Sequence, residues 1–191
     1  MAHTLNILQL CRKGSRALGP GLRYVIWVQG CPFHCPHCET PEGRSFEPNT
    51  VIGVDELAED IIACPEIGGI TISGGEPLEQ ADALTELLHK VRQSRPELTV
   101  ISYTGYRYEE LTSENAKAYL AELDLLIDGP YIHELNDNQG IRGSSNQRLI
   151  FLSDRLKNNE QELATGKRKL EFIFHGSEYT VIGLLNKKNT K

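Results

Sequence analysis

Short apolar runs separated by turn residues mark the candidate strands of this chain. The clearest run, at 24–28, is apolar almost throughout and carries β-branched and aromatic residues. Such a run is typical of a strand buried on both faces of a parallel sheet. By the same criteria the sequence predicts further strands at 5–10, 68–73, 98–103 and 123–127. Each run ends in a polar or glycine-bearing turn.

Apolar residues at helical spacing lie between these runs. One predicted helix carries Val54, Leu57, Ile61 and Ile62 and ends near Cys64–Pro65, because the residue before proline resists the α conformation. A second helix begins at Pro77 and buries Leu84, Leu87, Leu88 and Val91. A third covers about 108–122, with Leu111, Ala118 and Leu120 turned inward.

Strand and helix therefore alternate, which predicts a parallel sheet with right-handed crossovers. A chain of 191 residues is too short for a full eight-unit barrel of about 250 residues. We expect an α/β fold, a partial (β/α)6-type parallel barrel with a C-terminal β-hairpin extension. The hairpin is predicted by strand-like runs at 169–174 and 179–183 joined by the turn at 175–178. The expected division is a core domain at 1–150 and an extension at 151–191 packed on the core.

Composition narrows the class of protein. The net charge of −6 gives no reason to expect binding to nucleic acid or to an anionic membrane. No apolar run approaches the ~20 residues of a membrane span, and the first residues lack the layout of a signal peptide. Five cysteines, three of them crowded together, argue against a secreted disulfide framework. We expect a cytoplasmic protein.

The crowded cysteines carry the candidate chemistry. Cys31, Cys35 and Cys38 follow the strand at 24–28 with the spacing C-x3-C-x2-C, in a loop that also holds two prolines. Such a loop can place three thiolates around one metal centre or iron–sulfur cluster. A structural zinc site completed by His34 and His37 is the alternative. Cys11 and Cys64 are better explained as packing residues.

A second candidate stretch is Gly74-Gly75-Glu76-Pro77, at the end of the strand at 68–73. Glycines at a strand end let the backbone approach a ligand closely. A helix that begins at Pro77 would direct free N–H groups toward that ligand, and Glu76 could meet an ammonium group. The alternative is an ordinary turn with an exposed glutamate.

Together these motifs resemble the radical S-adenosylmethionine superfamily, and within it the activating proteins of anaerobic ribonucleotide reductase and other glycyl-radical enzymes. The narrower similarity covers most of residues 18–150. It rests on Gly19-Pro-Gly-Leu-Arg23, Trp27-Val-Gln-Gly-Cys-Pro32, Ser73-Gly-Gly-Glu-Pro-Leu78, Tyr103-Thr-Gly-Tyr106, Ile127-Asp-Gly129 and Arg142-Gly-Ser-Ser-Asn-Gln-Arg148.

The resemblance implies a four-iron, four-sulfur cluster held by Cys31, Cys35 and Cys38, with S-adenosylmethionine bound at the iron without a protein ligand. It implies that Gly74, Gly75 and Glu76 hold the amino group of S-adenosylmethionine, and that His37 lies near the adenine. Reductive cleavage would then give a 5′-deoxyadenosyl radical that takes a hydrogen atom from the substrate. An electron donor such as a reduced flavodoxin is also implied.

Polar residues at two further strand ends are candidate contacts to the cofactor or substrate. They are Ser102, Thr104 and the neighbouring Gly105 at one end and Asp128 at another. Asp128 could instead bind a cation or cap the following turn.

Three functions fit the sequence. The first is an activase that installs a glycyl radical on a partner enzyme. The second is a radical enzyme of the same build that modifies a small molecule or a peptide directly. The third is a non-catalytic cluster or zinc module. Typical ribonucleotide reductase activases stop soon after the Arg142–Arg148 stretch, whereas about forty residues follow it here. These residues could cap the barrel edge or dock a protein or peptide substrate.

Overall fold

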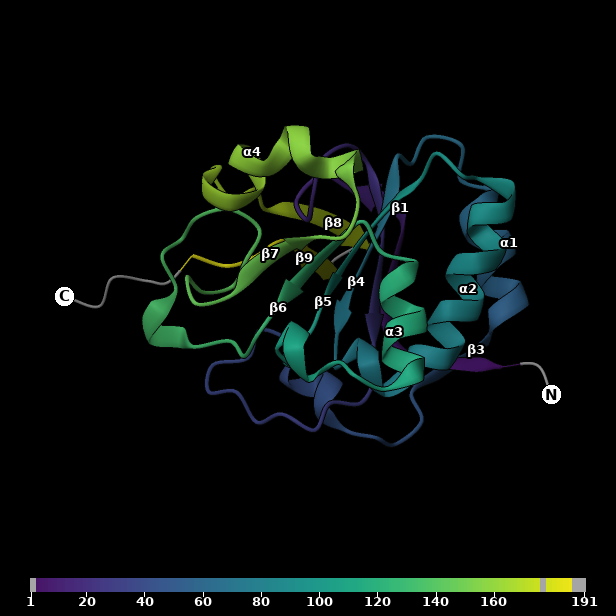
Figure 1. Ribbon diagram of the computed structural model, residues 1–191, viewed down its shortest axis with the longest axis horizontal. Coiled ribbons are helices and arrows are strands. Elements are labelled where there is room, and N and C mark those ends of the chain that lie inside the picture. Colours follow the sequence, from purple (N-terminus) through teal and green to yellow (C-terminus); the bar gives the residue numbers. More distant parts are fainter. Residues whose placement is uncertain (1–2, 176–177, 187–191) are drawn as a thin grey trace.

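A mixed seven-stranded sheet forms the centre of the protein (Figure 1). The computed structural model describes residues 3–175 and 178–186. The strand order in the sheet is β3-β1-β2-β4-β5-β6-β7, and β8 and β9 form a separate pair. The strands are β1 (Thr4–Ser15), β2 (Arg23–Val28), β3 (Thr50–Gly53), β4 (Gly69–Gly74), β5 (Thr99–Tyr103), β6 (Leu125–Asp128), β7 (Arg148–Phe151), β8 (Glu171–His175) and β9 (Glu178–Ile182).

The middle of the sheet is parallel and its two sides are antiparallel. Strands β2, β4, β5 and β6 run parallel to one another, whereas β1 and β3 on one side and β7 on the other are antiparallel to their neighbours. The predicted α/β class is confirmed, and so are the five predicted strands. Strands β3 and β7 were not predicted from the sequence. The barrel form of the sheet stays a prediction.

Helices α1 (Val54–Ile62), α2 (Ala81–Ser94) and α3 (Glu114–Ala121) cover one face of the sheet (Figure 1). The first two match the prediction, except that a 3-10 turn, η2 (Pro77–Gln80), precedes α2. The third prediction, a helix over 108–122, is partly wrong. Residues 108–110 form a separate 3-10 turn, and α3 starts after Ser113, whose side chain accepts a hydrogen bond from Ala116 N. Ala118, predicted to face inward, is exposed.

Residues after 150 cover the opposite face. A 3-10 turn, η5 (Asp154–Asn159), and helix α4 (Glu160–Thr165) bury Leu156 and Leu163 against β5 and β6. Ile182, at the end of β9, is 1% exposed and packs in a cluster with Cys11 and Trp27. The interpretation of Cys11 as a buried packing residue is thus confirmed, and Cys64 packs against the core of the helical face.

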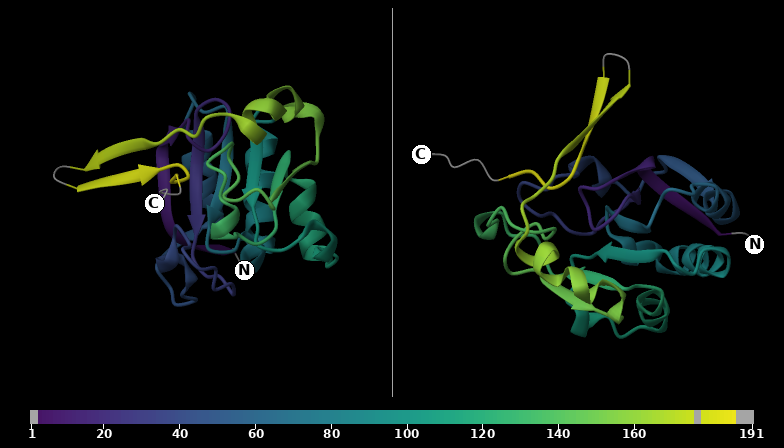
Figure 2. Two further views of the ribbon diagram at one scale, coloured as in Figure 1. Left: turned by 90° about the vertical axis from the view of Figure 1, so that its left-hand side faces the viewer. Right: turned by 90° about the horizontal axis from the view of Figure 1, so that it is seen from above.

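The predicted hairpin is present as β8 and β9, and it projects away from the body of the protein (Figure 2). Its predicted turn includes residues 176–177, which lie outside the described residues. Within residues 3–175 and 178–186, none of the helices combines the length and the apolar composition that a bilayer crossing requires.

Candidate functional site

A cavity of about 340 Å³ opens at the carboxyl ends of the parallel strands, on the sheet face opposite α1–α3. All three predicted ligands, Cys31, Cys35 and Cys38, line it, together with the turn Gly74–Glu76 and Thr104. Its volume lies within the range of ordinary small-molecule sites. The topology therefore gathers both candidate motifs at one sheet edge, as expected for an α/β fold.

The cysteine loop is held at this edge by hydrogen bonds from backbone and side chains. Gly30 N donates to Gly43 O at 2.9 Å, and Cys31 N donates to Arg44 O at 3.2 Å. The Arg44 guanidinium in turn donates to Cys35 O at 2.6 Å. These bonds tie the loop to the 3-10 turn η1 (Pro41–Arg44) at both its start and its middle. The loop therefore keeps a defined path although it contains no regular structure.

The chemistry of the three cysteine thiols fits the binding of a metal-containing group. Burial, with added repulsion from Glu76 and the other two thiols, raises the pKa of Cys31 to about 11. Thiols in such surroundings ionise when a positively charged metal group binds them, and soft thiolates favour iron–sulfur clusters or zinc. Neither His34 nor His37 lines the cavity with the cysteines. Among the described residues, no three His, Cys, Asp or Glu side chains are grouped as ligands of one metal ion.

The two glycines after β4 are required by contacts between backbones. Gly74 has φ of 99°, and a Cβ there would lie 2.6 Å from Val28 N. A Cβ on Gly75 would lie 2.3 Å from Gly30 O and 2.9 Å from Gly43 O. These glycines thus permit a close approach of the turn to the backbone of β2 and of the cysteine loop, and the predicted close approach to a ligand stays a prediction.

Glu76 places a buried carboxylate at the same position. It is 1% exposed and accepts hydrogen bonds from Leu78 N at 3.0 Å, Thr104 Oγ1 at 2.9 Å and Gly105 N at 2.8 Å. Burial raises its pKa to about 7, despite these three donors. No salt bridge among the described residues involves Glu76. A buried carboxylate without a cationic partner fits the ammonium group of a ligand.

His37 and Thr104 occupy different surroundings. Thr104 lines the cavity, is only 3% exposed, and donates a hydrogen bond from its hydroxyl to Glu76. His37 lies in the left-handed region with φ of 58°, and its exposed ring stacks on His133 with 4.2 Å between ring centroids. It stands in the cysteine loop without lining the cavity.

Two predicted site residues lie on the other side of the sheet. Ser102 hydrogen-bonds with Tyr119 of α3 at 2.8 Å. Asp128, which is buried, accepts from Tyr108 N at 2.8 Å and forms an ion pair with Arg148, whose side chain is 46% exposed. Neither lines the cavity. The reason is strand alternation: Ser102 and Asp128 share the parity of Val100 and Leu126, which face the helices.

Tyr103, the residue after Ser102, was not predicted as a site residue. Tyr103 lines the cavity, as does Trp27 at the matching end of β2. The detectable signal is an aromatic residue near the carboxyl end of each of these two strands, β2 and β5, on the face without helices. The extension also contributes cavity residues, namely Val181, Gly183, Leu184 and Leu185. A single sequence gives no signal for that placement, because it depends on long-range packing.

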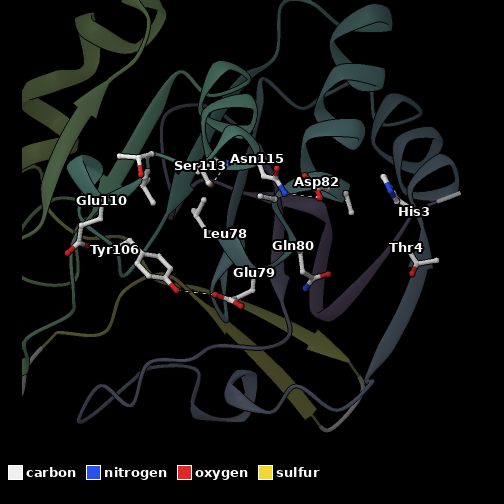
Figure 3. A pocket seen from close by; sticks show the side chains of 15 residues that line it. His3, Thr4, Leu78, Glu79, Gln80, Asp82, Tyr106, Glu110, Ser113 and Asn115 are labelled. Carbon is white, nitrogen blue, oxygen red and sulfur yellow. Dashed lines mark hydrogen bonds between the residues drawn. The ribbon is translucent and has the colours of Figure 1, made fainter. Parts of the chain in front are cut away.

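A second, larger hollow of about 580 Å³ lies where the segment 78–83 meets the start of α3 (Figure 3). In it Tyr106 donates to Glu79 at 3.1 Å and Asn115 donates to Asp82 at 3.0 Å. None of the predicted site residues lines it. Size alone would select this hollow, but the thiols and the buried carboxylate select the smaller cavity.

Comparison with known proteins agrees with the cavity chemistry. A family described as "4Fe-4S single cluster domain" matches residues 17–150. The anaerobic ribonucleoside-triphosphate reductase-activating protein of Enterobacteria phage T4 is 34% identical over 141 residues, covering 71% of this chain and 88% of the phage protein. The protein of the same name from Escherichia coli K12 is 33% identical, covering 70% and 91%. A pyruvate formate-lyase-activating enzyme of Staphylococcus aureus USA300 is 37% identical over 82 residues, covering 40% and 33%.

Proposed function

Since this chain belongs to the family of radical S-adenosylmethionine activating proteins with a single four-iron, four-sulfur cluster, we propose that it installs a glycyl radical on a partner enzyme of the anaerobic ribonucleotide reductase type. The observation that carries the proposal is the shared cavity. Three thiols and one buried, uncompensated carboxylate line the same space of about 340 Å³. A cluster and an amino-acid ligand need these two features side by side.

The roles proposed for the residues follow from their positions. Cys31, Cys35 and Cys38 would hold the cluster, and the carboxylate of Glu76 would bind the ammonium group of S-adenosylmethionine. The backbone at Gly74 and Gly75 sets the distance between these two groups. When bound, the cluster and S-adenosylmethionine supply reductive cleavage and hydrogen-atom abstraction, with electrons from a donor such as a reduced flavodoxin.

His37 would lie beside the adenine, as in the family pattern. The proposal leaves out Ser102 and Asp128, because their hydrogen bonds give both a structural role on the helical face. Trp27 and Tyr103 give the cavity apolar walls, which exclude water from a reactive site.

The proposal also covers the location of the protein, its division into a core and an extension, and the form of its sheet. A cytoplasmic location is supported by the crowded thiols, which persist in a reducing compartment. A core at 1–150 with an extension at 151–191 is supported by the family match, which ends at residue 150. The partial (β/α)6-type barrel is supported by four parallel strands whose loops converge on one cavity.

The test uses protein purified without oxygen, reconstituted with iron and sulfide, reduced, and given S-adenosylmethionine alone. We expect chromatography to detect 5′-deoxyadenosine with the wild type and not with Cys35→Ala. Addition of a purified anaerobic ribonucleotide reductase should then produce a glycyl radical visible by electron paramagnetic resonance. A protein that binds zinc instead, or that carries a cluster without ever cleaving S-adenosylmethionine, would overturn the proposal.

A further inference from the structure

The C-terminal extension forms one wall of the proposed active-site cavity. Val181, Gly183, Leu184 and Leu185 all line it, although they lie more than 140 residues from the cysteine loop in the chain. These residues are apolar, whereas the cysteines and Glu76 form a polar part of the lining. The cavity is therefore incomplete without residues that follow the part matched by the family.

Two side chains attach this wall to the core. Both carboxylate oxygens of Glu39, the residue after the last cysteine, accept from Leu185 N at 3.1 Å. Arg168 donates to Leu185 O at 2.9 Å and to Arg142 O at 2.7 Å. One end of the extension is thus bonded to the cysteine loop and to the Arg142 segment at once. The burial of Ile182 against Trp27 completes the attachment.

Beyond this attachment the hairpin presents an exposed apolar strip, formed by Phe172, Phe174, Tyr179 and Val181. Phe174 pairs directly with Tyr179 across the two strands, and Phe172 pairs with Val181. Directly paired residues share one face of a hairpin, so the four side chains lie together. Phe174 is 72% exposed and Tyr179 is 60% exposed. The strip continues into the cavity, because Val181 belongs to both.

We propose that this apolar strip docks the glycine-bearing segment of the partner glycyl-radical enzyme and guides it into the cavity. The inference rests on the proposed function. The hairpin projects from the body of the protein (Figure 2). An exposed group of aromatic side chains on such an element marks a protein-binding surface. Its continuity with the cavity identifies the part of the partner that must lie on it, namely the chain on either side of the reacting glycine.

The chemistry of glycine explains why such a strip is needed. A glycine has no side chain that could fill a specific pocket, so its neighbours must supply the binding energy that positions its α-carbon. In an extended segment these neighbours direct their side chains outward at every second residue, where a flat apolar strip can receive them. A small-molecule substrate would be enclosed by the cavity and would leave the strip exposed.

The experiment compares wild type with the double variant Phe174→Ser/Tyr179→Ser. Neither Phe174 nor Tyr179 lines the cavity. The probe is the purified glycyl-radical enzyme encoded in the same genome. Three quantities are measured: 5′-deoxyadenosine formed without partner, the Kd for the partner, and the glycyl radical yield. We expect unchanged 5′-deoxyadenosine formation, at least tenfold weaker binding, and a matching loss of radical below saturation. Val51→Ser, at an exposed apolar position on β3, is the matched control and should change none of them.

The possible failures are distinguishable. If wild type forms no 5′-deoxyadenosine, the proposed function itself fails. If the double variant binds and activates the partner as well as wild type does, the docking role of the strip is wrong while the function stands. Sedimentation of wild type and of the double variant tests a third outcome, dimerisation through the strip. If wild type is a dimer that the double variant breaks, with partner affinity unchanged, the strip binds a second copy of this chain and the inference is overturned.

Discussion

Replacing Gly75 by alanine tests whether the turn after β4 positions the cysteine loop through backbone contact. The added Cβ would lie 2.3 Å from Gly30 O, well inside van der Waals contact. Gly30 cannot move independently, because its O accepts from Glu76 N at 2.7 Å and its N donates to Gly43 O at 2.9 Å. Relief of the overlap therefore displaces the start of the cysteine loop by about 1 Å.

The size of the effect follows from overpacking. Inserting a methyl group into a closely packed site typically costs about 1–3 kcal/mol. For a chain of this size that loss lowers Tm by roughly 3–10 °C. The displacement also reaches Cys31, the residue after Gly30. We therefore expect Gly75→Ala to reconstitute with less iron and sulfide than wild type, beyond any effect on folding.

The assay combines thermal unfolding of the cluster-free protein with iron and sulfide analysis after anaerobic reconstitution. Gly53→Ala is the matched control, because Gly53 has φ of −65° and no atom lies within 4 Å of the position of its added Cβ. It should keep full iron content and change the free energy of unfolding by no more than about 1 kcal/mol, because a cost at the N-cap of α1 offsets the smaller entropy of the unfolded chain. A Gly75→Ala protein with the Tm and iron content of wild type would refute the argument.

Two further predictions concern buried carboxylates. Because burial raises the folded-state pKa of Glu76 to about 7, the cluster-free protein loses stability as pH rises from ~4.5 through about 7, and Glu76→Gln should flatten that part of the pH profile in urea unfolding. A profile with the same slope in wild type and Glu76→Gln would contradict this. Asp128→Asn should cost about 1–3 kcal/mol through its bonds to Tyr108 N and Arg148 and leave S-adenosylmethionine affinity unchanged. Weaker binding of S-adenosylmethionine at unchanged stability would instead restore Asp128 to the site.

Elements with a strong local pattern could be predicted from the sequence. The run at 24–28 became β2, buried along its whole length, and the stripe of Leu84, Leu87, Leu88 and Val91 became the inner face of α2. Short elements with mixed patterns could not. Strands β3 and β7 have four residues each, and all of these except Ile52 are exposed or half-buried, so no period separates them from loops. The start of α3 depends on the Ser113 cap, which a spacing argument does not locate.

The motif residues of the site could be predicted from the sequence. Which strand residues face the cavity and which face the helices could not. The cysteines and the Gly74–Glu76 turn are local signals, and the parallel topology brings them together. The choice between Ser102 and Tyr103 depends on which sheet face carries the helices, and polarity alone selected the residue that faces away from the cavity. A polar residue facing the helices is satisfied by one partner, Tyr119 for Ser102, and is then unavailable to a ligand.

Glu76 connects ligand recognition with the order of the site. Its N–H holds Gly30 of the cysteine loop, and its carboxylate accepts from Thr104 and Gly105 of the loop after β5. These donors favour the charged carboxylate, whereas burial opposes the charge. A bound ammonium group would remove that opposition and strengthen every bond that the carboxylate accepts. Binding of the amino-acid ligand and ordering of the loops around the thiols are therefore expected to stabilise each other.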